Sequence, residues 1–220
     1  MKKVVVPPLS TIYPILLQRF GHRDWWPGDT PFEIVLGAIL TQNTAWSNVE
    51  KAIANLKRAK VFSLKGLRGI PEAELAALIR SSGYFNQKAK KIKAFLAFLD
   101  ERYGGSLAQL KKAPLEKLRA ELLGVKGIGP ETADSILLYA LEKKVFVVDA
   151  YTRRIFARHY YFDPGPSYDA VQERFERELP DDLDLYNDFH AQIVAVGNRY
   201  CKPKPKCEGC PLENLPHRME

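Results

Sequence analysis

The 220-residue sequence lacks any apolar run long enough to cross a bilayer. Hydrophobic residues make up 46% of the chain, but they fall in short periodic runs, so we expect a globular protein with no membrane partner. A secretory signal is also lacking, because Pro7 and Pro8 interrupt the apolar run after Lys2 and Lys3 too early. These absences predict a cytoplasmic protein.

Strand-forming patterns are nearly absent as well. Residues 145–148 alone resemble a strand, and one short strand cannot build a sheet. Apolar residues recur instead at three- and four-residue spacing, with proline and glycine between the runs, as is typical of amphipathic helices. The helical runs are 32–40, 49–56, 74–79, 89–99, 115–122, 133–141, 152–160, 168–179 and 189–200. The sequence therefore predicts an all-α fold.

Charge of one sign is in excess. The chain has 33 Lys and Arg against 26 Asp and Glu, which gives a formal net charge of +7. Such a balance favours a polyanionic partner, although many proteins are this basic for other reasons.

A glycine-rich hairpin is the most informative motif of the chain. Gly124-Val125-Lys126-Gly127-Ile128-Gly129 precedes Pro130, which suits the first turn of a helix. Glycines let the turn bring backbone N–H groups close to a ligand, and a helix start attracts phosphate. The motif predicts a grip on a nucleic-acid backbone that does not read its sequence. On these residues alone, a tight turn between packed helices is the alternative.

Asp149 follows the apolar segment 145–148 directly. An acid at this place is either the N-cap of a helix from Ala150 onward or a catalytic carboxylate, and both can hold. Position alone favours the cap.

The hairpin, the helical run after it and Asp149 together resemble the helix-hairpin-helix and Gly/Pro-Asp signature of the endonuclease III superfamily of DNA glycosylases. The resemblance implies two helical lobes, one of residues 1–24 plus 137–220 and one of residues 25–136, with the DNA cleft between them. It also implies a nucleoid-associated monomer that binds damaged double-stranded DNA. The residues implied in DNA binding are Gln42, Asn43, Gly124, Val125, Lys126, Gly127, Ile128, Gly129 and Thr132.

The resemblance makes Asp149 the catalytic residue. Removal of a base from deoxyribose passes through an oxocarbenium-like sugar, which a nearby carboxylate stabilises while water attacks. Bifunctional members have a lysine directly before Thr-Ala, where this chain has Glu131, and glutamate cannot form a Schiff base. The implied enzyme is monofunctional and has no lyase activity at abasic sites. The alternative is that Lys126 takes the role of the missing lysine.

All three tryptophans lie close together in the sequence, as Trp25, Trp26 and Trp46. Clustered aromatics usually form core, but Trp25-Trp26-Pro27 also suits a slot for a flipped base, and indole faces hold cationic alkylated purines well. With Leu-Thr-Gln-Asn-Thr and Gly-Pro-Glu-Thr-Ala, this motif resembles the 3-methyladenine DNA glycosylase branch, which places Glu131 in the base pocket too. Trp46 departs from that branch, where a smaller ring is expected.

Gln42 and Asn43 stand just before the Trp46 position, in the Leu-Thr-Gln-Asn-Thr motif. They resemble residues that fill the gap left by the extruded base. Simple helix capping is the alternative.

The leading hypothesis is a base excision repair enzyme for alkylated purines such as 3-methyladenine. The alternatives are a glycosylase for oxidised pyrimidines or mismatched thymine or adenine, and a helix-hairpin-helix module that binds DNA without catalysis.

Only three cysteines occur, as Cys201, Cys207 and Cys210. Their spacing suits metal ligands better than a disulfide in an intracellular protein. The loop 201–210 resembles the 4Fe-4S loop of endonuclease III, which has four cysteines, and His217 stands near the fourth place. A cluster, a zinc site and no metal are the three possibilities, and the chemistry needs none of them.

Overall fold

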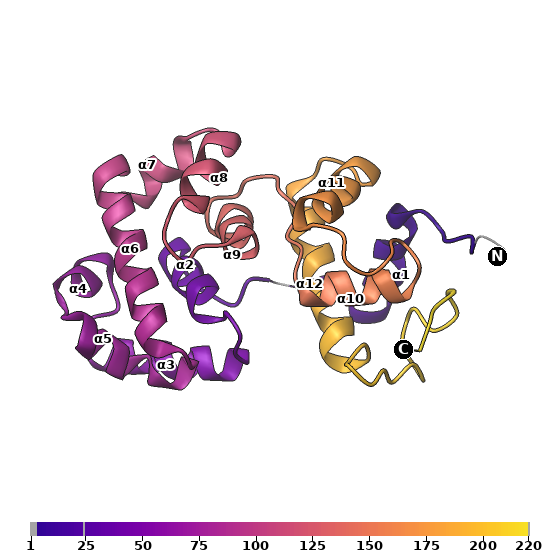
Figure 1. Cartoon of the computed structure of the whole chain (residues 1–220), viewed down its shortest axis with the longest axis horizontal. Coiled ribbons are helices and arrows are strands. Elements are labelled where there is room, and N and C mark those ends of the chain that lie inside the picture. The colour runs from indigo at the N-terminus through magenta and orange to yellow at the C-terminus, as the bar shows by residue number, and fades with distance from the viewer. Residues whose placement is uncertain (1–3, 24, 220) are drawn as a thin grey trace. The chain divides into compact units, whose positions relative to one another are not determined.

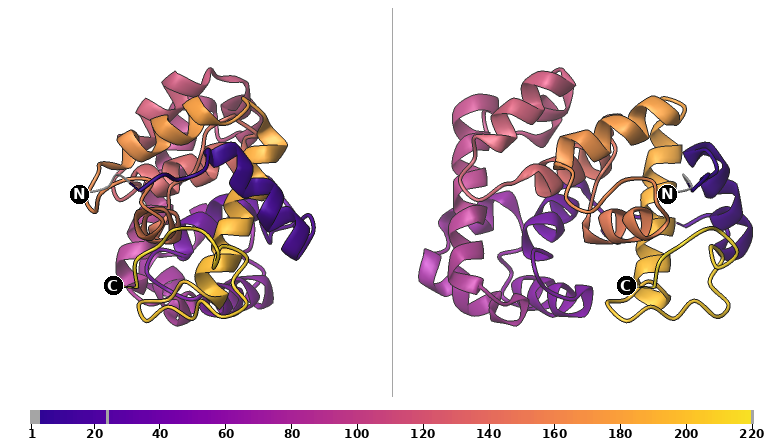
Figure 2. Two further views of the ribbon diagram at one scale, coloured as in Figure 1. Left: turned by 90° about the vertical axis from the view of Figure 1, so that its right-hand side faces the viewer. Right: turned by 45° about the vertical axis from the view of Figure 1, so that its right-hand side comes forward.

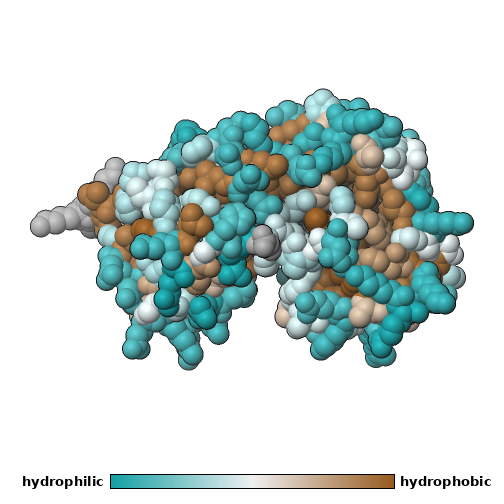
Figure 3. Space-filling view, turned by 180° about the vertical axis from the view of Figure 1, so that it is seen from behind, coloured by the Kyte–Doolittle hydropathy of each residue, from teal (hydrophilic) through white to brown (hydrophobic). Residues whose placement is uncertain are grey.

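The computed structural model describes residues 4–23 and 25–219. Lys2, Lys3 and Asp24, which flank the sequence motifs above, lie outside this range. All regular structure in the described residues is helical, as Figure 1 shows, so the all-α prediction is confirmed. No helix among these residues has the length and apolar character needed to cross a membrane. Hydrophilic side chains cover much of the face seen in Figure 3.

The chain divides into two compact units. The terminal unit contains residues 1–26 and 144–220, and the hairpin unit contains residues 27–143. The C-terminal boundary of the hairpin unit, residue 143, lies seven residues beyond the predicted boundary at residue 136. The reason is that the π-helical turn Ile136–Ala140 packs on α2 (Pro31–Leu40) and stays with the hairpin unit.

The hairpin unit is built around α2 and the long helix α6 (Phe85–Tyr103). Thr30 caps α2 by accepting a hydrogen bond from the backbone N–H of Glu33, and Pro31 fills the first turn. Ser63 and Ser106 cap two further helices in the same way. The remaining helices are α3 (Trp46–Arg58), α4 (Leu64–Gly69), α5 (Glu72–Leu78), α7 (Leu107–Lys112), α8 (Leu115–Leu123) and α9 (Pro130–Ser135).

Lys88 closes the C-terminal end of α2 from within the core. It is 1% exposed, and its Nζ donates to the carbonyl oxygens of Leu40 at 2.8 Å and Ser82 at 2.6 Å. Burial lowers the pKa of Lys88 to about 8. The ammonium group satisfies carbonyls that the end of a helix leaves unpaired.

The terminal unit contains α1 (Ile12–Phe20), α10 (Ala150–Arg158), α11 (Tyr168–Glu178) and α12 (Leu183–Arg199). Aromatic rings form its core, with Phe146 stacked on Phe175 at 4.4 Å between ring centroids. The predicted run 189–200 begins six residues after the start of α12, which Asp182 sets by capping the helix.

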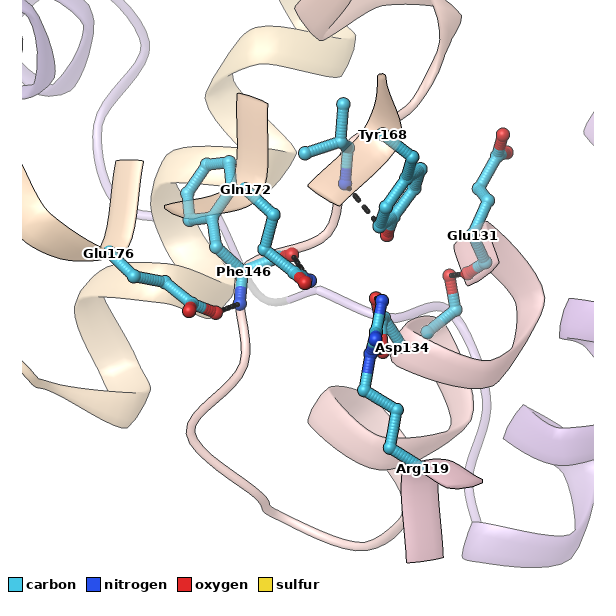
Figure 4. A network of polar contacts seen from close by, with 9 residues as sticks. Arg119, Glu131, Asp134, Phe146, Tyr168, Gln172 and Glu176 are labelled. Carbon is cyan, nitrogen blue, oxygen red and sulfur yellow. Dashed lines mark hydrogen bonds and ion pairs between the residues drawn. The ribbon is translucent and has the colours of Figure 1, made fainter. Parts of the chain in front are cut away.

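Residues 145–148, the strand-like run, are buried and form no strand in the described part of the chain. Side chains of α11 satisfy their backbone groups instead, as Figure 4 shows. Gln172 donates to the carbonyl of Phe146 at 2.7 Å, and the N–H of Phe146 donates to Glu176 at 2.8 Å. This segment leads directly into Asp149, so α11 fixes the approach to that residue.

Candidate active site and DNA-binding hairpin

The predicted hairpin joins α8 to α9. Val125 and Ile128 are buried at 7% and 4% exposure, while Lys126, Gly127 and Gly129 are exposed. The N–H of Ile128 donates to the carbonyl of Val125 at 3.0 Å and closes the turn. The apolar residues therefore anchor the hairpin and leave its backbone and Lys126 facing solvent.

Gly127 is the position where the turn requires glycine. Its φ is +89°, and an added Cβ would lie 2.5 Å from the side chain of Lys91. Gly129 differs, because its φ is −94° and nothing lies within 4 Å of an added Cβ. The two glycines of Gly-Ile-Gly thus have different structural demands.

Gln42 is bonded to this hairpin. Its Nε2 donates to Thr132 Oγ1 at 2.8 Å and to the carbonyl of Gly127 at 3.3 Å, and Lys91 Nζ donates to its Oε1. Gln42 therefore ties the end of α2 and α6 to the hairpin and the start of α9.

Asn43 adopts a left-handed φ of +53° and is exposed. Ala45 occupies the N-cap of α3, so neither Gln42 nor Asn43 is the capping residue there. The two residues paired in the sequence motif thus have different environments, one bonded to the hairpin and one facing solvent.

A buried ion pair holds the two helices of the motif together. Arg119 on α8 donates Nε to Asp134 Oδ1 at 2.9 Å and Nη2 to Oδ2 at 3.2 Å, as seen in Figure 4. Asp134 on α9 is fully buried, and the bidentate geometry fixes the angle of its partner. The sequence analysis missed this pair, although an aspartate within the apolar run 133–141 was a signal for it. Glu131, in the first turn of α9, is exposed.

Asp149 is the N-cap of α10. Its Oδ1 accepts hydrogen bonds from the backbone N–H of Thr152 at 2.7 Å and from Thr152 Oγ1 at 2.8 Å. Its Oδ2 lies 3.7 Å from Nε2 of His190 on α12. Oδ1 therefore caps α10, as the capping interpretation predicts, and Oδ2 faces His190.

Three influences set the protonation of Asp149. Burial of the carboxylate acts to raise its pKa, but His190 and then the hydrogen bonds from Thr152 lower it, and the net shift is downward. The group is therefore a carboxylate at neutral pH, held in a site where its residue is only 8% exposed. His190 was not identified from the sequence, because it lies within the periodic apolar run 189–200.

Trp25 and Trp26 lie in edge contact, with ring centroids 5.9 Å apart. Both are partly exposed rather than buried in the core. They line an open cavity of about 640 Å³ together with His22, Arg23, Asp184 and Asn187. Pro27, Trp46 and Glu131, the other predicted pocket residues, belong to the hairpin unit.

Helix α12 connects this cavity with Asp149 inside the terminal unit. Asp184 and Asn187 line the cavity, and His190 approaches Asp149. Steps of three residues are neighbours on a helix surface, and six residues rise about 9 Å along its axis. The tryptophan pair and the buried carboxylate therefore flank one short stretch of α12.

Asp188, which is buried on the same helix α12, fixes the segment that precedes the two tryptophans. It accepts hydrogen bonds from the N–H of Arg23 at 2.7 Å and from Tyr13 Oη at 2.8 Å. Gln192 donates to the carbonyl of Gly21 at 2.7 Å. Burial and the Asp188 contact raise the pKa of Tyr13 to about 12, so Tyr13 remains a donor.

The three cysteines line a separate cavity of about 320 Å³ in the terminal unit, together with His159 and His217. Among residues 4–23 and 25–219, no three His, Cys, Asp or Glu side chains converge on a point that would hold a single metal ion. Burial lowers the pKa of His159 to about 4, so its ring is neutral at pH 7.

Comparison with known proteins places this architecture in a family. Residues 36–181 match the family described as HhH-GPD superfamily base excision DNA repair protein. The chain is 46% identical to the putative DNA repair glycosylase MJ1434 of Methanocaldococcus jannaschii, over 98% of both chains. It is 32% identical to endonuclease III of Thermotoga maritima, over 90% of this chain and 87% of that protein.

Solved structures agree. The H. pylori 3-methyladenine DNA glycosylase MagIII, bound to 1,N6-ethenoadenine, superposes with a TM-score of 0.78 at 32% identity, covering 86% of this chain and 97% of that one. An endonuclease III–DNA complex shares the fold with a TM-score of 0.80 at 24% identity, covering 93% and 92%. The family match over residues 36–181 and the 46% identical relative show that the chain belongs to the HhH-GPD superfamily, as a DNA glycosylase of base excision repair.

Proposed function

We propose that the protein is a monofunctional glycosylase that hydrolyses the N-glycosidic bond of alkylated purines, such as 3-methyladenine, flipped out of double-stranded DNA. The observation that carries the proposal is the arrangement around α12. A buried, ionised Asp149 lies on one side of His190, and a cavity with two tryptophans lies one to two turns away.

Asp149 stabilises the developing positive charge on the sugar. Thr152 holds Oδ1 with two donated hydrogen bonds, so the carboxylate has a fixed orientation before substrate binds. A fixed charge in a buried site stabilises an oxocarbenium-like transition state strongly, because no reorganisation is needed during the reaction. Water is the nucleophile.

Glu131 supports hydrolysis without strand cleavage. It stands where bifunctional members have their Schiff-base lysine, and a carboxylate cannot form an imine. Lys126, the alternative amine, is exposed on the hairpin and suits a contact with backbone phosphate. Borohydride is therefore expected to trap no covalent adduct with an abasic duplex, and an adduct that disappears in Lys126→Ala would contradict the proposal.

The tryptophan cavity supports a cationic base. Indole faces attract a positively charged ring, and Asp184 brings a carboxylate into the same cavity. The H. pylori relative, named as a 3-methyladenine DNA glycosylase, was solved with 1,N6-ethenoadenine bound.

A base-release assay tests the substrate. The protein is incubated with methylated DNA and with duplexes that contain single defined lesions, and the released bases are separated and identified. We expect 3-methyladenine to be released fastest. Release of thymine from a mismatch, or of an oxidised pyrimidine, in place of alkylpurines would reassign the enzyme within its family.

A further inference from the structure

The two carboxylate oxygens of Asp149 have different surroundings. Oδ1 accepts two hydrogen bonds from Thr152, one from its backbone N–H at 2.7 Å and one from its hydroxyl at 2.8 Å. A carboxylate oxygen has two lone pairs, so these two donors occupy Oδ1. Oδ2 faces Nε2 of His190 at 3.7 Å. Oδ2 is therefore the oxygen left to act on a sugar or on water, and His190 stands beside it.

His190 reaches Asp149 from a helix that packs closely on α10, as the right-hand view of Figure 2 shows. Gly197 of α12 allows this approach, because a Cβ there would lie 2.2 Å from the ring of Tyr151 on α10. Tyr151 Oη also donates to Asn198 Oδ1 at 2.5 Å. Tyr151 follows Asp149 by two residues, so contacts elsewhere on the two helices fix the distance from His190 to the carboxylate.

Both side chains are removed from water, since His190 is 3% exposed and Asp149 is 8% exposed. Burial of Asp149 acts to raise its pKa, and a protonated carboxyl group offers no negative charge to a sugar. The interaction with His190 is the larger of the two influences that lower this pKa, and the hydrogen bonds from Thr152 are the smaller. His190 thus opposes the effect of burial on the carboxylate.

The phenols nearby cannot replace this effect. Burial and the charge of Asp149 raise the pKa of Tyr151, so it stays a neutral phenol at pH 7. Tyr168 of α11 accepts a hydrogen bond at 3.2 Å from the N–H of Val148, the residue before Asp149. A phenol cannot carry positive charge, whereas an imidazole can. Compensation of the carboxylate at Oδ2 therefore comes from His190.

We propose that His190 is a positioning residue for base excision, which holds Oδ2 of Asp149 in place and keeps the carboxylate charged while the glycosidic bond breaks. This role of His190 rests on the proposed catalytic role of Asp149. Because His190 acts through Asp149, its loss should slow bond cleavage and leave the affinity for DNA unchanged.

The test measures cleavage and binding separately in the full chain. Single-turnover release of 3-methyladenine from methylated duplex DNA gives the rate of cleavage. Fluorescence anisotropy with a duplex that contains a tetrahydrofuran analogue of an abasic site gives the affinity, with no base to excise. We expect His190→Leu to lower the rate about ten-fold or more and to keep the affinity within about two-fold of the parent.

His190→Gln separates positioning from packing. The glutamine amide places an N–H near the position of the ring Nε2, so this variant should recover most of the rate. Tyr186→Phe is the matched control, because Tyr186 is also buried on α12, one turn before His190. Burial raises the pKa of its hydroxyl to about 12, with smaller contributions from Glu176, Asp181 and Asp182. This hydroxyl faces a different set of carboxylates, and Tyr186→Phe should excise as the parent does.

A double variant tests whether His190 acts through Asp149. The carboxylate charge is already absent in Asp149→Asn, so adding His190→Leu should slow excision by less than about two-fold more. The pH profile gives a second measurement. Without His190 the effect of burial on the pKa of Asp149 is less opposed, so the acid-side midpoint of excision should move to higher pH in His190→Leu.

Two results would overturn the role of His190. One is a rate in His190→Leu equal to that of the parent, and the other is the same slowing by His190→Leu in the parent and in Asp149→Asn. Melting temperatures accompany each variant. If His190→Leu is unfolded, His190→Asn, whose amide nitrogen corresponds to Nδ1 rather than Nε2, takes its place.

Failure of the proposed function has a different signature. A parent that releases no alkylpurine would reassign the substrate, and the same variants would then be compared on the lesion that the parent does release. An unchanged rate in Asp149→Asn would remove the catalytic role of Asp149, and the role of His190 with it.

Discussion

The hairpin unit and the terminal unit solve different physical problems. The hairpin unit presents backbone and Lys126 to solvent and fixes them from behind with Gln42, Lys91 and the Arg119–Asp134 pair. In the terminal unit the charge of the candidate active site is itself buried, because Asp149 is only 8% exposed. The first design suits contact with any phosphate backbone, and the second suits stabilisation of charge on one sugar. Substitutions in the two units should therefore affect different kinetic steps.

The largest effect is expected from Asp149→Asn in the terminal unit. Loss of the negative charge should lower single-turnover excision by about 100-fold or more, while the affinity for damaged duplex remains. Asp182→Asn is the matched control, because Asp182 also caps a helix in this unit by accepting from a backbone N–H, that of Leu185. Equal and small losses in both variants would mean that Asp149 is only a cap.

Gly127→Ala tests the hairpin unit. The left-handed φ and the contact with Lys91, whose Nζ is bonded to Gln42, make the new methyl group costly by about 1 to 3 kcal/mol. We expect DNA affinity to fall about ten-fold or more on damaged and undamaged duplex alike, measured by fluorescence anisotropy at fixed salt. Gly129→Ala, with open space around its Cβ, should bind as the parent does. A loss of affinity limited to damaged DNA would contradict the assignment of general backbone binding to the hairpin unit.

Trp25→Leu and Trp26→Leu sharpen the substrate assignment. Leucine keeps much of the apolar packing but removes the π face, so excision of cationic 3-methyladenine should fall about ten-fold, from a contact of about 1 to 2 kcal/mol. The excision of neutral bases should fall by a smaller factor. Equal losses on both substrates, with a lower melting temperature, would identify the pair as core.

The smallest effects are expected from Gln42→Ala and Asn43→Ala. Gln42 has hydrogen bonds to Thr132 and Gly127, so its loss should lower the free energy of unfolding by about 1 to 2 kcal/mol, measured with urea. Asn43 is exposed but has a left-handed φ of +53°, which alanine disfavours, so Asn43→Ala should lower stability by about 1 kcal/mol at most and slow excision from duplex DNA several-fold. If Gln42→Ala instead slowed excision and Asn43→Ala lowered stability more, Gln42 would be shown to leave the hairpin when DNA binds.

Features that depend only on neighbouring residues could be predicted from the sequence. Three- and four-residue periodicity predicted the helices, Gly-Ile-Gly-Pro predicted the hairpin, and the acid before Ala150 predicted the cap of α10. Each of these rests on local backbone preference, which a short window of sequence contains in full.

Contacts between distant groups could not be predicted and are seen only in the folded chain. His190 approaches Asp149 from 41 residues along the chain, and Gln42 reaches Thr132 from 90 residues away. The π-helical turn Ile136–Ala140 stays with the hairpin unit because it packs on α2, which no periodicity could indicate. Such contacts follow from the packing of helices against one another, and sequence spacing contains no record of which faces will touch.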